Sequence, residues 1–145
     1  MLTLTQRLPS TENLNAAITL FLTAEKRTRS RHRFEMPDGQ SLYLRLPRGT
    51  ILQDGDLLLS EAENVVVRVE AQPEPVITVR GKNHLDLLRA AYHLGNRHVP
   101  LEITTNYLRL NLDSVLFSML LKMGLDVQEE VVPFYPEVGA YNHNH

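Results

Sequence analysis

Histidines are the residues in this sequence with the clearest capacity for chemistry. There are six, at positions 32, 84, 93, 98, 143 and 145. His143 and His145 lie in the last seven residues, GAYNHNH. In an extended chain, residues two apart point to the same side with Cα atoms roughly 6.5 Å apart, so both imidazoles can reach one metal ion. A bare H-x-H pattern is weak, and a polar tail is the competing interpretation because chain ends tolerate most residues.

His98 is the second candidate ligand. It lies in the segment LGNRHVP, on the short connection between an expected helix and the next expected strand. Pro100 restricts the backbone of Val99, which makes this connection stiff. A histidine on a brief, rigid connection is well placed to present its ring at a surface. Taken alone, an ordinary surface loop histidine is the competing interpretation.

The other three histidines are weaker candidates. His32 lies between arginines in RSRHRF, and we interpret it as a surface strand residue because local positive charge disfavours a metal cation. His84 and His93 are nine residues apart on one expected helix, which places them on nearly opposite faces. They therefore cannot form a pair. We interpret His93 as a structural histidine that points inward or toward a subunit interface.

The composition narrows the chemistry further. The chain of 145 residues has no cysteine, which excludes disulfides, thiolate metal sites and a cysteine nucleophile. The remaining nitrogen and oxygen ligands suit nickel, zinc, copper(II) and harder ions. A formal net charge of −2 argues against nucleic-acid binding driven by bulk charge. Because G-x-S-x-G, H-E-x-x-H and phosphate-loop motifs are all missing, we expect no enzyme.

The sequence also bears on location. No apolar run approaches the ~18 residues of a membrane span. The N-terminal segment MLTLTQRLPSTENL lacks a basic region followed by an apolar one, as a secretory signal would have. We therefore expect a cytoplasmic protein.

The elements that must position these histidines fall into two halves. Residues 1–73 show alternating or apolar strand-like segments, MLTLTQ, QSLYLRL, DLLLS and NVVVRVEA, with turn signals such as PDG between them. This spacing predicts an all-β domain, a small barrel or a two-sheet sandwich, with no long helix in residues 1–72. The prolines of AQPEPV cannot continue a strand ladder, so we place a domain boundary there.

A basic run in the first half invites a separate interpretation. Arg27, Arg29, Arg31 and Arg33 alternate within a stretch of period-2 character, which predicts four guanidinium groups on one strand face. A solvated face is the simplest explanation, and an acidic protein partner or bound anion is the functional one. RNA is less favoured, because the second half lacks the aromatic residues on which RNA-binding sheets stack bases.

Residues 74–145 predict a ferredoxin-like β-α-β-β-α-β domain. The strands are expected in VITVR, VPLEITT, YLRLN and DVQEEVVPF. The first helix has an N-cap at Asn83 and a stop at Gly95, and the second has an N-cap at Asp113 and a stop at Gly124. The predicted apolar stripes are Leu87, Ala90, Ala91 and Leu94 in the first helix and Val115, Leu116, Met119, Leu120 and Met123 in the second.

Several segments together resemble the UreE family of urease accessory proteins. They are AYHLGNRHVPLEI, YLRLNLDSVLFSMLLKMGLDV and PFYPEVGAYNHNH, of which LGNRHVP and PE-x-GAY-x-H are the most specific. The segments KRTRSRHRFEMPDG and LPRGTILQDGDLL in the first half also fit. The resemblance therefore covers nearly the whole chain.

This resemblance implies a homodimeric nickel metallochaperone that serves the urease apoprotein and its accessory complex, which includes a GTPase. It implies that the first domain is similar to the peptide-binding domain of an Hsp40-type chaperone. It implies that His98, the histidine of the GNRH motif, binds Ni(II) at the dimer interface, and that His143 and His145 supply further ligands. Many relatives have long histidine-rich tails, so two tail histidines predict one principal site per dimer and little storage.

Ligand type alone does not select nickel. Imidazole ligands are expected to bind copper(II) more tightly than nickel and zinc comparably. The oligomer also stays open, since two dimers sharing one ion through four copies of His98 is an alternative. A protein-interaction module with incidental metal binding is the main competing function, and an RNA-binding domain is the third.

Overall fold

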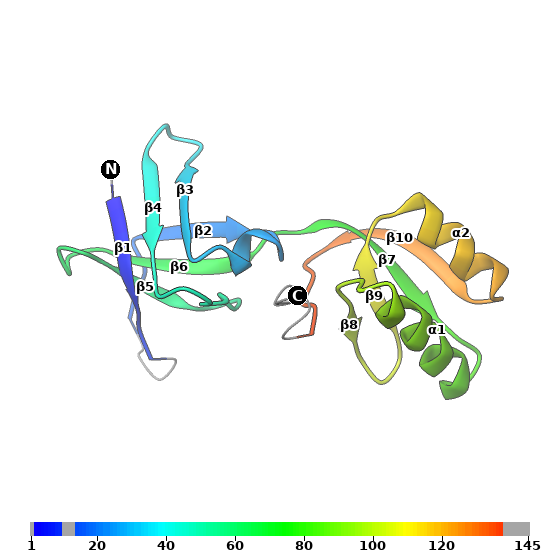
Figure 1. Cartoon of the computed structure of the whole chain (residues 1–145). Coiled ribbons are helices and arrows are strands. Elements are labelled where there is room, and N and C mark those ends of the chain that lie inside the picture. Colours follow the sequence, from blue (N-terminus) through cyan, green and yellow to red (C-terminus); the bar gives the residue numbers. More distant parts are fainter. Residues whose placement is uncertain (1, 10–13, 138–145) are drawn as a thin grey trace. The chain divides into compact units, whose positions relative to one another are not determined.

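The computed structural model describes residues 2–9 and 14–137, and the chain divides into two compact units, Met1–Ala71 and Gln72–His145 (Figure 1). In the described residues, the first unit contains strands and one short 3-10 helix, and the second alternates strands with two α-helices. The predicted α+β class, with an all-β half followed by a ferredoxin-like half, is confirmed.

The strands of the first unit form one six-stranded sheet in the order β2-β6-β5-β1-β4-β3. They are β1 (Leu2–Arg7), β2 (Ile18–Leu22), β3 (Arg31–Glu35), β4 (Ser41–Arg45), β5 (Leu57–Ser60) and β6 (Val66–Ala71). Two pairs are parallel, β1 with β4 and β2 with β6. The sheet curls, so that β3 and β4 stand across the direction of β2 and β6 (Figure 1). A single curled sheet thus replaces the expected barrel or two-sheet sandwich.

The curl allows one sheet to enclose its own core. Leucines from four strands, Leu4, Leu20, Leu44 and Leu58, are fully or almost fully buried and belong to one apolar cluster. In β2, β4 and β6 the buried positions alternate with more exposed ones, because successive side chains point to opposite faces of a strand. The predicted turns connect these strands, and Gly39 of PDG has a φ of 89°, which glycine adopts without steric cost.

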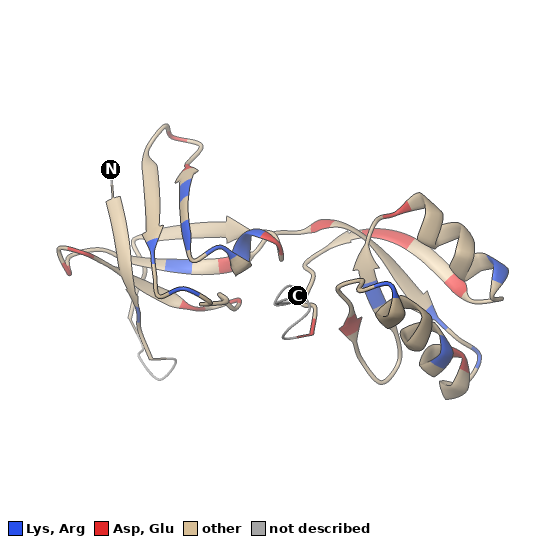
Figure 2. Ribbon diagram, in the orientation of Figure 1, with Lys and Arg blue, Asp and Glu red and all other residues tan. Residues whose placement is uncertain are grey.

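The basic run does not form one strand face, and the prediction of four aligned arginines is wrong. A 3-10 helix, η1 (Lys26–Thr28), interrupts the stretch before β3 begins, and both segments carry basic residues (Figure 2). Arg27 is buried and donates from Nη1 to the carbonyl oxygen of Leu22 at 2.9 Å. Arg29 pairs with Glu25 at 2.7 Å. Burial of one guanidinium and local pairing of another relieve the mutual repulsion that a single strand face would have imposed.

The second unit is an antiparallel four-stranded sheet in the order β10-β7-β9-β8. Its elements follow the order β7 (Glu74–Arg80), α1 (His84–Asn96), β8 (Glu102–Ile103), β9 (Leu108–Asn111), α2 (Ser114–Lys122) and β10 (Asp126–Val132). Ile77, Val79 and Leu110 pack with Leu94 of α1 and Leu120 of α2 in one core. In this strand order, β10 and β8 form the two opposite edges of the sheet.

Proline 75 lies inside a strand, although the sequence suggested that this proline-rich segment could not continue a ladder. Its carbonyl oxygen accepts from the backbone N–H of Leu112 at 3.3 Å, so its nitrogen faces the β9 side of β7. The β7–β9 pairing begins only at Val76. A donor is not needed at position 75, and the strand tolerates proline there.

Both helices begin where expected, and their apolar stripes agree only in part. The side chains of Asn83 and Asp113 accept from backbone N–H groups at 3.0 Å, as N-caps do. All four predicted stripe residues of α1 contact the core. In α2, Val115 is 75% exposed and Met123 is 38% exposed, and Phe117 packs against the core instead. Neither helix in the described part of the chain is long and apolar enough to cross a membrane.

Candidate metal centre

His98 lies at the C-terminal end of α1, in the position that reverses the chain direction. Its backbone N–H donates to the carbonyl of Gly95 at 3.0 Å, and that of Val99 donates to the carbonyl of Leu94 at 3.2 Å. This pair of bonds is a Schellman motif, with Arg97 as the C-cap and His98 at C′. His98 has a φ of 56°, one of only two positive values at non-glycine residues in the described chain.

The expected helix stop at Gly95 is therefore wrong, since α1 continues to Asn96. The Schellman motif places an apolar contact between the C3 and C″ residues. With His98 at C′, these are Leu94, which is fully buried, and Val99, which packs on the same core. A stop at Gly95 would instead have assigned the outer contact to Asn96, a polar residue. Core packing decides the register of the turn over glycine's local preference.

The position of His98 gives its side chain a defined origin. The residue is exposed, and its main chain is held by bonds on either side of it. A left-handed conformation costs an L-residue about 1–2 kcal/mol relative to the right-handed one. Histidine adopts it more readily than most residues, yet a strained conformation of this kind occurs preferentially at functional sites. The main chain at His98 thus directs an imidazole outward from a fixed corner.

The described residues of one chain do not bring a complete metal site together. Within residues 2–9 and 14–137, no group of three or more His, Asp or Glu side chains is arranged to hold an ion. His143 and His145 lie outside the described residues. Of the predicted ligands, His98 alone lies within the described residues, and an ion bound there needs further donors from outside this described part of the chain.

The remaining histidines lie in other places. His32 is in β3, where its ring meets that of Phe34 edge-on at 4.6 Å between centroids. His84 begins α1 and lines an apolar groove beside Leu88 and Ile103. His93 is exposed, and its ring lies edge-on to that of Tyr92 at 5.4 Å. It does not point into the core of its own unit.

A cluster of polar side chains lies on the sheet face opposite the helices. Arg109 of β9 is at its centre, with Nη1 3.5 Å from Glu102 and Nη2 3.5 Å from Glu130. Its Nε donates to the hydroxyl of Thr78 at 3.0 Å. The hydroxyl of Tyr107 donates to Glu102 at 3.1 Å, and the Arg109 guanidinium lies over the Tyr107 ring at 4.5 Å. Each of these five side chains therefore contacts at least one other member of the cluster.

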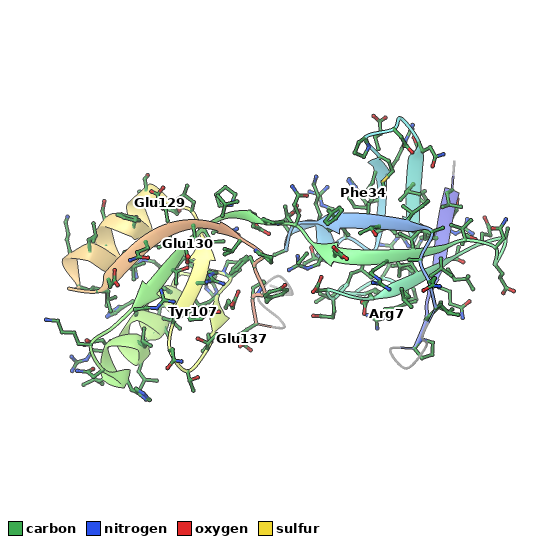
Figure 3. The ribbon with its side chains drawn as sticks, turned by 180° about the vertical axis from the view of Figure 1, so that it is seen from behind. Arg7, Phe34, Tyr107, Glu129, Glu130 and Glu137 are labelled. Carbon is green, nitrogen blue, oxygen red and sulfur yellow. The ribbon has the colours of Figure 1, made fainter. Side chains whose placement is uncertain are left out.

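One carboxyl group in this cluster, that of Glu130, has a shifted pKa. The Thr78 hydroxyl donates to Glu130, and this hydrogen bond lowers the pKa of the Glu130 carboxyl below its usual value. Desolvation opposes the shift, and the positive charge of Arg109 reinforces it. Glu130 is therefore an ionised partner of Arg109 at neutral pH. Figure 3 shows Glu130 on β10 and Tyr107 just before β9.

The cluster also binds the segment that follows β10. Oε1 of Glu102 accepts from the backbone N–H of Tyr135 at 2.9 Å. The backbone N–H of Glu137 donates to the carbonyl of Leu101 at 2.9 Å. These residues were not predicted as a site, although the alternation of Tyr107 and Arg109 in YLRLN already places both on one strand face. The pattern does not show that Glu102 of β8 lies next to them, because that depends on the pairing of β8 with β9.

Comparison with known proteins bears on both units. Residues 4–72 match the model of the UreE urease accessory protein N-terminal domain, and residues 74–145 match that of the UreE urease accessory protein C-terminal domain. The chain belongs to the UreE family. Urease accessory proteins UreE from Nostoc sp. (strain PCC 7120) and Nostoc punctiforme are 58% and 57% identical to it over 145 residues.

The similarity to the Nostoc sp. protein covers the whole of this chain and 99% of that protein. A more distant UreE from Burkholderia lata is 44% identical and is covered over 72% of its length. The predicted UreE resemblance is confirmed. Membership assigns the chain to the accessory proteins that act in urease maturation, and not to urease itself.

Proposed function

We propose that this UreE-family chain carries Ni(II) to the urease apoprotein during assembly of its metallocentre. His98, His143 and His145 are the proposed ligands. The observation that carries this proposal is that His98 is exposed at the C-terminal end of α1, where its backbone is left-handed. Glu137, the last described residue, is hydrogen-bonded to Leu101, three residues after His98. Neutral imidazole nitrogen is a good ligand for nickel(II).

The proposed site needs more than one chain. In a twofold dimer, a residue near the axis occurs twice, so two His98 rings can face one ion. Two imidazoles leave an ion under-coordinated, and tail histidines from one or both subunits complete the ligand set. Such a divided ligand set favours ready exchange, which a carrier needs in order to release its cargo. Zinc and copper(II) are expected to compete for the same ligands.

In this proposal the two units have different roles. Residues 74–145 bind the metal and form the homodimer, and residues 1–73 dock the partners, which are urease and its accessory proteins including a GTPase. The proposed location is the cytoplasm. A protein-interaction module with incidental metal binding is the competing function, and the breakup of the arginine face removes part of its support.

Calorimetric titration with nickel tests this proposal. We compare the intact chain, His98→Ala and a chain that ends at Tyr141, and we measure their oligomeric state by light scattering. His98→Ala should lose most nickel affinity and stay dimeric, and the truncated chain should lose less. Affinity should also fall below about pH 6, because protonated imidazole cannot coordinate. Nickel binding by His98→Ala equal to that of the parent would refute the assignment.

His93→Ala is the matched control. His93 is an exposed histidine on the same helix, five residues before His98, but its backbone is helical. This variant should bind nickel like the parent. An equal loss in both variants would show that general histidine content, and not the helix corner, determines binding.

A further inference from the structure

The five residues after β10 cross the second unit from one side of its sheet to the other. Strand β10 ends at Val132 on one edge, and β8 forms the opposite edge. Three inter-strand spacings separate them, about 14 Å. Figure 1 shows the orange segment leaving β10 and descending beside β8, and Figure 3 shows Glu137 away from Glu129 and Glu130 on β10.

This segment, residues 133–137, is firmly attached at its far end. Tyr135 and Glu137 donate their backbone N–H groups to Glu102 and Leu101, respectively, both at 2.9 Å. Phe134 is fully buried. Pro133 and Pro136 restrict the backbone and keep the segment extended. These five residues therefore behave as a strap across the sheet, not as a free end.

Glu102 is built to hold the strap. It is only 7% exposed, and a buried carboxylate is costly unless it is paired. Its Oε2 is 3.5 Å from Nη1 of Arg109 and accepts from Tyr107, which leaves Oε1 for the Tyr135 N–H. A hydrogen bond to an ionised acceptor is roughly twice as strong as one between neutral groups. The partly buried Arg109 therefore pairs with one oxygen of the carboxylate whose other oxygen holds a backbone amide of the strap.

The strap determines where the tail begins. His98 precedes Leu101 by three residues, a separation of at most about 11 Å. His143 follows Glu137 by six residues, a reach of up to about 20 Å. Because Glu137 and Leu101 are hydrogen-bonded, the tail histidines of a chain can reach His98 of the same chain. A tail that started at Val132 would begin at the opposite edge of the sheet.

We propose that residues 133–137 deliver the C-terminal tail to the His98 end of α1, and that Glu102 is the positioning residue that fixes this strap. The inference rests on the proposed function only in its consequence for nickel. Releasing the strap lengthens the free chain before His143 from six residues to eleven. Effective concentration falls roughly as the −3/2 power of linker length, which predicts about a 2.5-fold loss of nickel affinity for a fully released strap.

The test compares Glu102→Ala with Glu130→Ala, each in the full chain and in a chain that ends at Tyr141. Glu130 is the matched control because it is a carboxylate on the same face that shares Arg109, and its hydrogen bonds are to Thr78 and Arg109. Glu102→Ala should weaken nickel binding by up to about 2.5-fold in the full chain, the limit for a fully released strap, and leave the truncated chain unchanged. Glu130→Ala should bind nickel like the parent at both lengths.

Amide hydrogen exchange on metal-free protein tests the strap without reference to nickel. Protection at Tyr135 and Glu137 should fall in Glu102→Ala and persist in Glu130→Ala. Unchanged protection, or an equal loss of nickel affinity in full and truncated chains, would overturn the inference. If His98→Ala and truncation leave nickel binding intact while protection falls as expected, the proposed function fails and the strap stands.

A conservative variant keeps the test informative if Glu102→Ala does not fold. Glu102→Gln retains the shape and an acceptor oxygen but loses the charge. Circular dichroism should show a folded chain, and protection at Tyr135 should fall by a smaller factor than in the alanine variant. Parental protection in Glu102→Gln would contradict a charge-assisted hold on the strap.

Discussion

The two helices of the second unit end in the same hydrogen-bond pattern with different residues at the turn. At the end of α2, Gly124 donates to Leu121 at 2.9 Å and Leu125 donates to Leu120 at 3.3 Å. At the end of α1, His98 and Val99 make the corresponding bonds. Gly124 has a φ of 81° and His98 a φ of 56°, so both occupy the left-handed C′ position.

The difference separates a turn that serves only the fold from one that also presents a side chain. Glycine reverses the chain at α2 without steric cost, and it is the usual C′ residue. Histidine makes the same reversal at α1 at some cost in stability, and in exchange an imidazole projects from the corner. The identical bonding shows that the turn itself does not need the histidine. A role for the ring is the physical explanation that we favour.

The largest expected effect tests whether nickel binding requires a histidine at the C-terminal end of α1 in particular. In His98→Gly, nickel affinity should fall more than about 100-fold, because even groups that only orient metal ligands contribute 10- to 100-fold. Adding Gly124→His to this variant moves a histidine to the equivalent corner of α2. Calorimetry should show no recovery. Recovery in the double variant would mean that any histidine at a helix corner suffices.

The next effect concerns the apolar residue that follows each turn. Leu125 is 6% exposed, whereas Val99 is only partly buried. Leu125→Ala should lower the free energy of unfolding by about 2–4 kcal/mol, and Val99→Ala by about 1 kcal/mol, in proportion to the buried surface removed. Urea denaturation measures both. Equal losses would show that Val99 and Leu125 contribute equally to stability despite their different burial.

The smallest effect is opposite in sign at the two corners. Gly124→Ala places a Cβ on left-handed backbone and should cost about 1–2 kcal/mol of stability. His98→Gly removes that strain and should raise stability by about 0.5 kcal/mol, since glycine's greater unfolded-state entropy offsets part of the gain. Thermal and urea unfolding of metal-free protein provide the measurement. Destabilisation by His98→Gly would show that contacts of the histidine ring outweigh its backbone strain.

Much of the second unit follows from local sequence signals. The stripe of α1, the N-caps Asn83 and Asp113 and the order of strands were all predicted, because each depends on residues close together in the chain. The position of His98 on the α1–β8 connection followed from the same signals. Its left-handed backbone did not follow from them, since Gly95 was a nearer candidate for the helix end and the packing of Leu94 and Val99 on the same core favours the later one.

The first unit was less predictable for a related reason. Alternation suggested one long basic strand, yet Arg27 turns inward to bond the Leu22 carbonyl and the chain bends at η1. The spacing of charged residues along the chain does not show that the folded core has room for the side chain of Arg27. The curl of the sheet is likewise a property of six strands together.

The sequence by itself determined the family, the two-part α+β organisation and the histidines worth testing, because these depend on residue types and short-range spacing. Only the tertiary structure decided that His98 takes the C′ position, that Glu102 faces Arg109 and that the chain after β10 crosses to the opposite edge of the sheet. Each of these outcomes depends on contacts between segments far apart in the chain, where packing of the whole core outweighs local preference.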